Sequence, residues 1–113
     1  MDISKDLEEK VYEAIEIAKT TGRIKKGINE VTKAVEKGQA KLAVIAKDIN
    51  PSEITMHMQP LCNEKSTPLV AVKSKEELGA ASGIGRSTTA VAIIQEGEAK
   101  NLVKEIISNL KND

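Results

Sequence analysis

The residues best suited to chemistry lie in one short segment, Lys25-Lys26-Gly27-Ile28-Asn29-Glu30-Val31-Thr32-Lys33. Gly27 permits a close backbone approach, and a helix that begins here presents unbonded N–H groups. Asn29 donates and accepts hydrogen bonds, ionised Glu30 only accepts them, and Lys33 attracts phosphate. This combination suits nucleic-acid base edges beside a phosphate backbone. The structural alternative is that Asn29 caps the helix while Glu30 complements its dipole, and both interpretations can hold together.

The local charge around this segment favours the nucleic-acid interpretation. The 113-residue chain has 17 Lys and Arg against 17 Asp and Glu, so its formal net charge is zero. Residues 19–47 nevertheless carry a local net charge of +6, which predicts a phosphate-binding face. A solvated surface that only confers solubility is the alternative. The basic residues of this stretch are Lys19, Arg23, Lys25, Lys26, Lys33, Lys37, Lys41 and Lys47.

Composition excludes several other kinds of site. Tyr12 is the only aromatic residue, which rules out recognition of bases by stacking on aromatic platforms. Cys62 is the only cysteine, which excludes an intrachain disulfide and a multi-cysteine zinc site, and we expect neither metal nor cofactor. The apolar runs are far shorter than the roughly 20 residues of a membrane helix, and the polar N-terminus lacks the apolar core of a secretory signal. We therefore expect a soluble cytoplasmic protein without membrane contact, monomeric when free.

Two enzymatic interpretations fail on spacing and context. Residues 80–87 nearly match the phosphate-cradling loop of nucleotide hydrolases, but Ala80 replaces its first glycine and Arg86 its lysine. A helix rather than a strand is also predicted before this loop. His57 and Cys62 have no third group to orient them as base and nucleophile. We interpret Cys62 as buried and His57 as a surface or helix-end residue, and we predict that the chain is not an enzyme.

Helices and short strands alternate along the chain, which predicts one domain over residues 1–113. The expected fold is a three-layer α/β/α sandwich with a short mixed sheet of about four strands. Apolar residues at helical spacing predict about five helices. They are a helix at 7–18 between Ser4 and Gly22, a helix at 29–38 capped by Asn29, a helix with Asn50 as its cap and Pro51 at its first position that bends at Pro60, a short helix opened by a capping box at 74–77, and a helix at 102–110. Strands are expected at 23–25, 42–46, 68–72 and 90–94, with 42–46 central. The pair Glu8-Glu9 is expected on a solvated face.

Four segments of the chain, 27–38, 40–48, 61–65 and 74–79, resemble the archaeal large-subunit ribosomal protein L-seven-Ae family. The run glycine-x-asparagine-glutamate-x-x-lysine at 27–33 is the most specific part of the similarity, which extends through nearly the whole chain. Members have the α/β/α fold expected above and bind the kink-turn, a sharply bent RNA whose two helices are separated by an internal bulge. The resemblance implies a ribosomal protein that is also a core component of guide-RNA (box C/D and H/ACA) particles, with other ribonucleoprotein proteins as partners.

The resemblance also implies roles for individual residues of the first segment. Asn29 and Glu30 would contact the guanines of tandem sheared G·A pairs. Lys26 and Lys33 would contact the neighbouring backbone, and Gly27 would permit the close approach.

The family's second RNA-binding element corresponds to the loop at residues 83–88. Many archaeal members carry leucine or isoleucine, glutamate and valine at the positions of Ile84, Gly85 and Arg86, whereas the sequence here is closer to the valine-serine-arginine of eukaryotic relatives. Ile84 would pack against an unstacked nucleotide, and Arg86 would reach a phosphate or lie over a base. We therefore expect this loop to set the preference among kink-turns.

Two other classes of function stay open. A protein-docking scaffold of a ribonucleoprotein would use the acidic, methionine-containing helix near residues 52–62, with RNA contact secondary. An enzyme would use the loop at Gly83 as an anion site.

Overall fold

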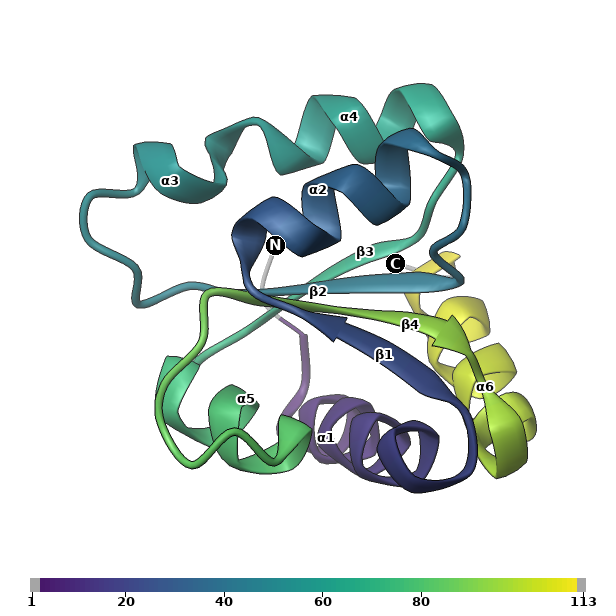
Figure 1. Ribbon diagram of the computed structural model, residues 1–113. Coiled ribbons are helices and arrows are strands. Elements are labelled where there is room, and N and C mark those ends of the chain that lie inside the picture. The colour runs from purple at the N-terminus through teal and green to yellow at the C-terminus, as the bar shows by residue number, and fades with distance from the viewer. Residues whose placement is uncertain (1–2, 112–113) are drawn as a thin grey trace.

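A mixed four-stranded sheet lies between two layers of helices (Figure 1). The computed structural model describes residues 3–111. Its elements in chain order are α1 Lys5–Thr21, β1 Arg23–Lys26, α2 Ile28–Glu36, β2 Leu42–Ala46, α3 Glu53–Met56, α4 Met58–Lys65, β3 Leu69–Val72, α5 Lys75–Ser82, β4 Ala90–Gln95, the 3-10 turn η1 Gly97–Ala99 and α6 Lys100–Lys111. The predicted fold class is thereby confirmed, and each of the four expected strands is present.

The strand order β1-β4-β2-β3 places the two most buried strands, β4 and β2, inside the sheet. β4 is antiparallel to both β1 and β2, and β2 is parallel to β3. The ends of β1, β2 and β3 therefore lie at the same end of the sheet as the start of β4. We call this the α2 end, because α2 begins directly after β1.

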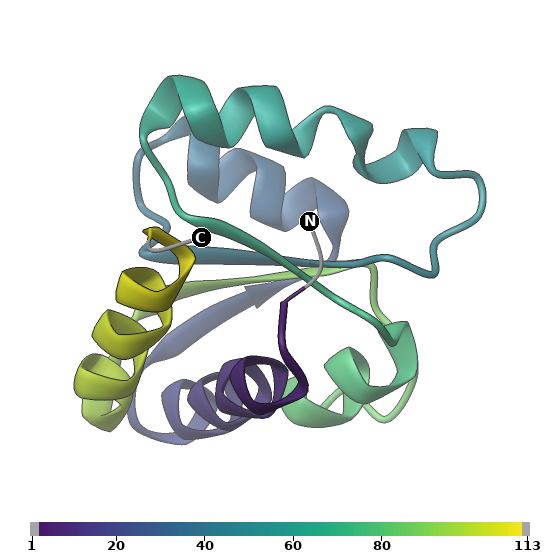
Figure 2. The same cartoon turned by 180° about the vertical axis from the view of Figure 1, so that it is seen from behind.

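Each face of the sheet has its own core (Figures 1 and 2). Helices α2 and α4 cover one face, and α1, α5 and α6 cover the other. The first core contains Val31, Val35, Ala43, Met58, Cys62, Ala90 and Ala92. The larger second core includes Val11, Ile15, Leu42, Val44, Leu78, Val91, Ile93 and Ile106. Burial of these side chains on both faces explains why β2 and β4 are continuous apolar runs.

Local signals fix the helices that the sequence predicted well. The Ser4 hydroxyl accepts a 3.1 Å hydrogen bond from the Leu7 N–H at the start of α1. Ser74 caps α5 in the same way through the Glu77 N–H, also at 3.1 Å. α1 ends at Gly22, where a Cβ would lie 2.0 Å from the Gln95 carbonyl oxygen. Only glycine fits this contact between the turn and the end of β4.

The predicted cap of α2 and the predicted bend at Pro60 are wrong. α2 begins at Ile28 after Gly27, which has φ +94°, so Asn29 lies inside the first turn and its side chain does not cap the helix. The next helix begins at Glu53 with Ser52 as its cap residue, not at Pro51 with Asn50 as its cap. It breaks into α3 and α4 at His57 instead of bending at Pro60. Pro60 is the third residue of α4, where its missing N–H has no helical partner to lose.

Glu8 does not lie on a solvated face as expected. Only 8% of this residue is exposed, and its carboxylate accepts a hydrogen bond from the Lys73 N–H at the end of β3. Glu9, its neighbour, is exposed. Burial of one carboxylate is tolerated here because a backbone donor is directed at it. None of the helices within residues 3–111 has the length and apolar character needed to cross a membrane.

Candidate nucleic-acid interface

The α2 end of the sheet brings together the two segments that the sequence singled out. The Gly27 N–H donates a 2.8 Å hydrogen bond to the Ala90 carbonyl, and Lys26 pairs with Val91 in the register of β1 and β4. The Ala46 N–H donates a 3.0 Å hydrogen bond to the Thr89 carbonyl. The start of α2 and the end of the loop before β4 are therefore neighbours, although they are far apart in the sequence.

The three polar residues of the motif share the outer surface of α2. Asn29, Glu30 and Lys33 are all exposed, whereas Val31, Ala34 and Val35 of the same helix are buried. Lys33 follows Asn29 by four residues and Glu30 by three, so the helical repeat places it beside both. Lys33 lies about one helical turn further along α2 than Asn29 and Glu30.

The first turn of α2 is open as well as exposed. No side chain among residues 3–111 caps this helix, and its N–H groups begin directly after Gly27. A Cβ built on Gly27 would meet nothing within 4 Å. Gly27 is therefore required by its backbone conformation, and its surface is free for close approach. The open N–H groups and the helix dipole together favour an anionic group at this position.

The loop at residues 83–88 is tied down to α5. The Ile84 N–H donates to the Gly79 carbonyl at 3.3 Å, and the Thr88 N–H donates to the Lys75 carbonyl at 3.1 Å. Gly83 ends α5 with φ +80°. The role of Gly79 was not predicted from the sequence, although a glycine inside a helix lowers the stability of that helix and so indicates a packing reason.

The loop presents its predicted residues in different ways. Ile84 is partly buried, whereas Gly85 and Arg86 are exposed. Arg86 lines a groove together with Glu76, Ala80, Gly85 and Ser87. No acidic side chain of the described chain forms an ion pair with this guanidinium. Arg86 is therefore available to an anionic or planar partner at the surface.

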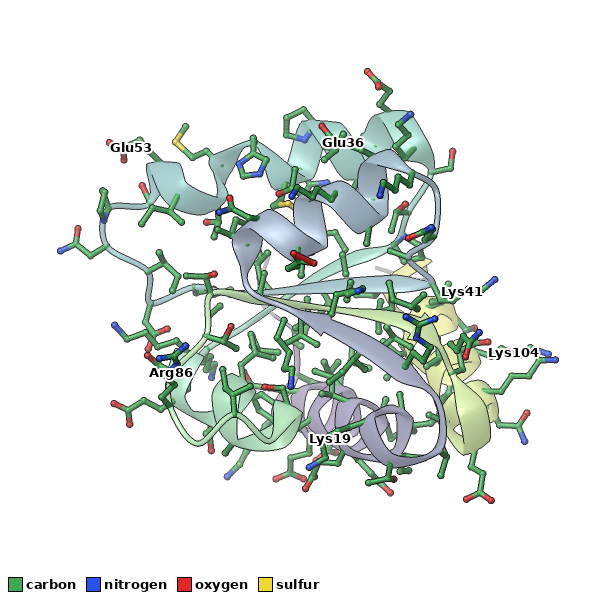
Figure 3. The ribbon with its side chains drawn as sticks, in the orientation of Figure 1. Lys19, Glu36, Lys41, Glu53, Arg86 and Lys104 are labelled. Atoms are coloured by element: carbon green, nitrogen blue, oxygen red, sulfur yellow. The ribbon has the colours of Figure 1, made fainter. Side chains whose placement is uncertain are left out.

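The basic residues of the 19–47 stretch do not form one face, contrary to expectation. Arg23 pairs with Gln95 at the far end of β1, whereas Lys26 lies at the α2 end. The Lys41 N–H donates to the Ile93 carbonyl, which also places this residue away from the α2 end. Figure 3 shows Lys41 on the opposite side of the molecule from Arg86. The strands separate these cations because each strand carries the chain from one end of the sheet to the other.

His57 and Cys62 do not form a catalytic pair. The His57 Nε2 lies 2.8 Å from the Thr32 Oγ1 at the surface, where the ring joins α2 to the junction of α3 and α4. Cys62 is fully buried, and burial raises the pKa of its thiol to about 11, which opposes thiolate formation. Both residues thus have the positions expected from the sequence. The described residues contain no group of three or more His, Cys, Asp and Glu side chains that could hold a metal ion.

Comparison with known proteins agrees with this architecture. Residues 9–103 match the model of the Ribosomal protein L7Ae/L30e/S12e/Gadd45 family. Among solved structures, the chain is similar to a 15.5kD RNA binding protein of Giardia lamblia, with 30% sequence identity and a TM-score of 0.93. The match covers 98% of this chain and 92% of that one. The predicted family and the prediction that the chain is not an enzyme are confirmed, while an archaeal origin stays a prediction. The chain belongs to the Ribosomal protein L7Ae/L30e/S12e/Gadd45 family.

Proposed function

We propose that this protein is an RNA-binding component of ribosomes or other ribonucleoprotein particles that recognises and stabilises kink-turn RNA. The observation that carries the proposal is the position of the α2 start beside the start of β4, where the Gly27 N–H bonds to the carbonyl of Ala90, two residues after the 83–88 loop. The membership in a family of ribosomal proteins and the similarity to an RNA binding protein support it.

The exposed surface of α2 supplies the chemistry for base recognition in this proposal. The Asn29 amide and the Glu30 carboxylate contact the guanine edges of tandem sheared G·A pairs, since together they offer donors and acceptors. Lys26 and Lys33 contact the adjacent phosphates, and the open N–H groups of the first turn add to this attraction. Gly27 has no side chain, so the RNA backbone can approach closely.

The 83–88 loop supplies the second contact. The accessible part of Ile84 covers an unstacked nucleotide of the bulge, and Arg86 reaches a phosphate or stacks on a base. Gly85 has φ +71° and open space where a Cβ would lie, so it gives the RNA access to the loop backbone. The loop therefore sets the preference among kink-turns, while α2 sets whether a kink-turn is bound at all.

The cellular setting is part of the same proposal. The protein acts as a single domain over residues 1–113, in the large ribosomal subunit and in box C/D and H/ACA guide-RNA particles. Its partners are kink-turn RNA and other ribonucleoprotein proteins, and it is cytoplasmic, monomeric when free and independent of any cofactor.

A binding titration with two RNAs tests the proposal. One RNA carries a kink-turn, and the other has the same length and stems but Watson–Crick pairs in place of the tandem G·A pairs. We expect tight binding of the first RNA and loss of most of this affinity for the second at equal salt concentration. Equal affinity for the two RNAs would contradict kink-turn recognition.

A second candidate function is protein docking by α3, with RNA contact secondary. It is favoured by Ile54 and Met56, which are large apolar residues with 37% and 64% of their surface exposed. Such exposure on a short helix beside the α2 end suits a contact with another ribonucleoprotein protein. The variant Met56→Glu would then reduce particle assembly while kink-turn affinity stays unchanged. Normal assembly of this variant would contradict the docking function.

A further inference from the structure

Lys19 of α1 lies against the turn that opens the 83–88 loop. A Cβ built at Gly83 would lie 2.9 Å from Lys19 Cδ and 3.0 Å from its Nζ. Gly83 itself has φ +80°, so the turn already favours glycine. The lysine side chain thus covers the space above the turn, and its ammonium group lies at the base of the loop.

The position of Lys19 has a local effect on α5. Gly83 is the C-cap of this helix, so the Lys19 ammonium lies near the negative end of the helix dipole. A cation at such a position stabilises the last turn of the helix. This effect accounts for the contact between Lys19 and the Gly83 turn. Lys19 is nevertheless exposed to solvent.

Two further cations lie near the same turn, one on β1 and one in the 83–88 loop itself. Ile24 of β1 packs on the core that α1 and α5 cover, and Lys26 follows two residues later, so Lys26 lies on that side of the sheet as well. Arg86 lies in the loop itself, and Figure 3 shows Lys19 and Arg86 on the same side of the sheet. No acidic group within residues 3–111 forms an ion pair with any of the three.

We propose that Lys19 contributes an RNA contact from α1, in addition to those of α2 and the loop. The proposal rests on the proposed function and deepens it. The Lys19 ammonium contacts the phosphate backbone of the RNA strand that lies over the start of the 83–88 loop. Its aliphatic stem holds the Gly83 turn in place.

The chemistry of lysine selects phosphate as the group contacted. An ammonium group is a compact charge on a flexible stem, with three donors and no acceptor, so it does not discriminate between bases. Contacts of this kind add affinity and salt dependence but carry no sequence information. Lys19 therefore affects how tightly a kink-turn is bound and not whether the G·A pairs are required.

Three variants test the contact in the full chain with kink-turn RNA. Lys19→Met keeps most of the stem and removes the charge, and Lys19→Arg keeps a charge. Lys104→Met is the matched control, because Lys104 is exposed on α6 and lies far from Arg86 in Figure 3. Affinity is measured between about 0.05 and 0.4 M salt, and each variant is also melted.

We expect Lys19→Met to bind about 5- to 10-fold more weakly near 0.1 M salt and to flatten the log–log salt slope by about one unit, as counterion release predicts for one lost phosphate contact. Lys19→Arg is expected to restore most of both, and Lys104→Met to match the wild type. An unchanged affinity and slope in Lys19→Met would overturn the proposal, even if its melting temperature fell, because Lys19 would then act only on α5. Failure of kink-turn recognition itself appears separately, as equal binding by the wild type of RNAs with and without G·A pairs.

Discussion

Gly79 of α5 lies directly against the backbone carbonyl of Arg86. A Cβ on Gly79 would be 1.7 Å from that oxygen, a distance that no pair of non-bonded atoms tolerates, so the backbone would have to move. The Gly79 carbonyl also accepts the Ile84 N–H. One glycine therefore fixes two points of the loop, and its lack of a side chain determines where Arg86 is presented.

The variant Gly79→Ala is expected to displace the loop from α5. The new methyl group overpacks a backbone contact, which costs on the order of 1–3 kcal/mol and lowers the melting temperature. Affinity for kink-turn RNA should fall as well, because Ile84 and Arg86 move. Glu77→Gly weakens the same helix without touching the loop and serves as the control. If both variants lost the same affinity, the effect would be one of stability alone.

Glu30→Ala should weaken kink-turn binding while leaving the fold intact. Loss of a good bidentate base contact costs roughly 1–3 kcal/mol by analogy with groove readout. Glu30 is exposed and its backbone stays helical, so circular dichroism and melting should hardly change. Glu36→Ala, at the other end of the same helix, is the matched control. An affinity within experimental error of the wild type would show that the Asn29, Glu30 and Lys33 group is not the binding site.

The salt dependence of RNA binding should be modest, because the basic residues are divided between the two ends of the sheet. With about 3 to 5 phosphate contacts, counterion release gives a log–log slope of roughly −2 to −4. Lys26→Met should flatten this slope by about one unit, whereas Lys41→Met at the opposite end should not change it. A slope near zero in the wild type would mean that the basic residues serve only solubility.

Local signals in the sequence were sufficient for most of the fold. Ser4 and Gly22 delimit α1, and the apolar runs identify β2 and β4, because capping and burial act on neighbouring residues. The sequence also singled out Asn29, Glu30 and Lys33 on α2 by their types and spacing. All three are exposed, and RNA contact by these residues stays a proposal.

The errors arose where a distant contact decides the local structure. Asn29 does not cap α2 because Gly27, bonded to Ala90, already sets the start of the helix. Glu8 is buried because the Lys73 N–H reaches it from β3. Gly79 gave no sign of its partner, Arg86, because the loop folds back only in three dimensions. Pairings of this kind cannot be obtained from periodicity or capping signals.

Alkaline pH is expected to destabilise the protein through Cys62, which is buried, and Tyr12, which is partly buried. Burial raises the pKa of Cys62 from 9.0 to about 11, and burial, with smaller contributions from nearby carboxylates, raises the pKa of Tyr12 from 10.0 to about 12. Between its unfolded and folded pKa values each group keeps its proton only in the folded state, so stability is intact below pH 9 and falls as the pH rises towards 12. The slope for each group is at most about 1.4 kcal/mol per pH unit.

Urea unfolding at a series of pH values measures this loss. Cys62→Ala should reduce the decrease between pH 9 and 11, and Tyr12→Phe should reduce it between pH 10 and 12. Each variant is compared with its own stability at pH 7, which removes the cost of the substitution itself. A wild-type stability that stayed constant up to pH 11 would show that neither group is desolvated enough to matter.

Exchange of the loop residues Gly85 and Arg86 for glutamate and valine should alter the preference among kink-turns. The exchange removes an exposed cation and introduces an acid, so contacts to the bulge and the adjacent stem change while α2 is untouched. Gly85 has φ +71°, so glutamate there also strains the backbone, on the order of 1 kcal/mol, although it has open space around it. Arg86→Val alone keeps the glycine and separates the charge from the strain.

The measurement is the ratio of dissociation constants for two kink-turns that differ in bulge and stem, at one salt concentration. Both variants should change this ratio and still require the tandem G·A pairs, because that requirement belongs to Asn29 and Glu30. If both affinities were scaled together and the ratio stayed constant, Arg86 would supply only nonspecific attraction, and selectivity would have to reside in another element.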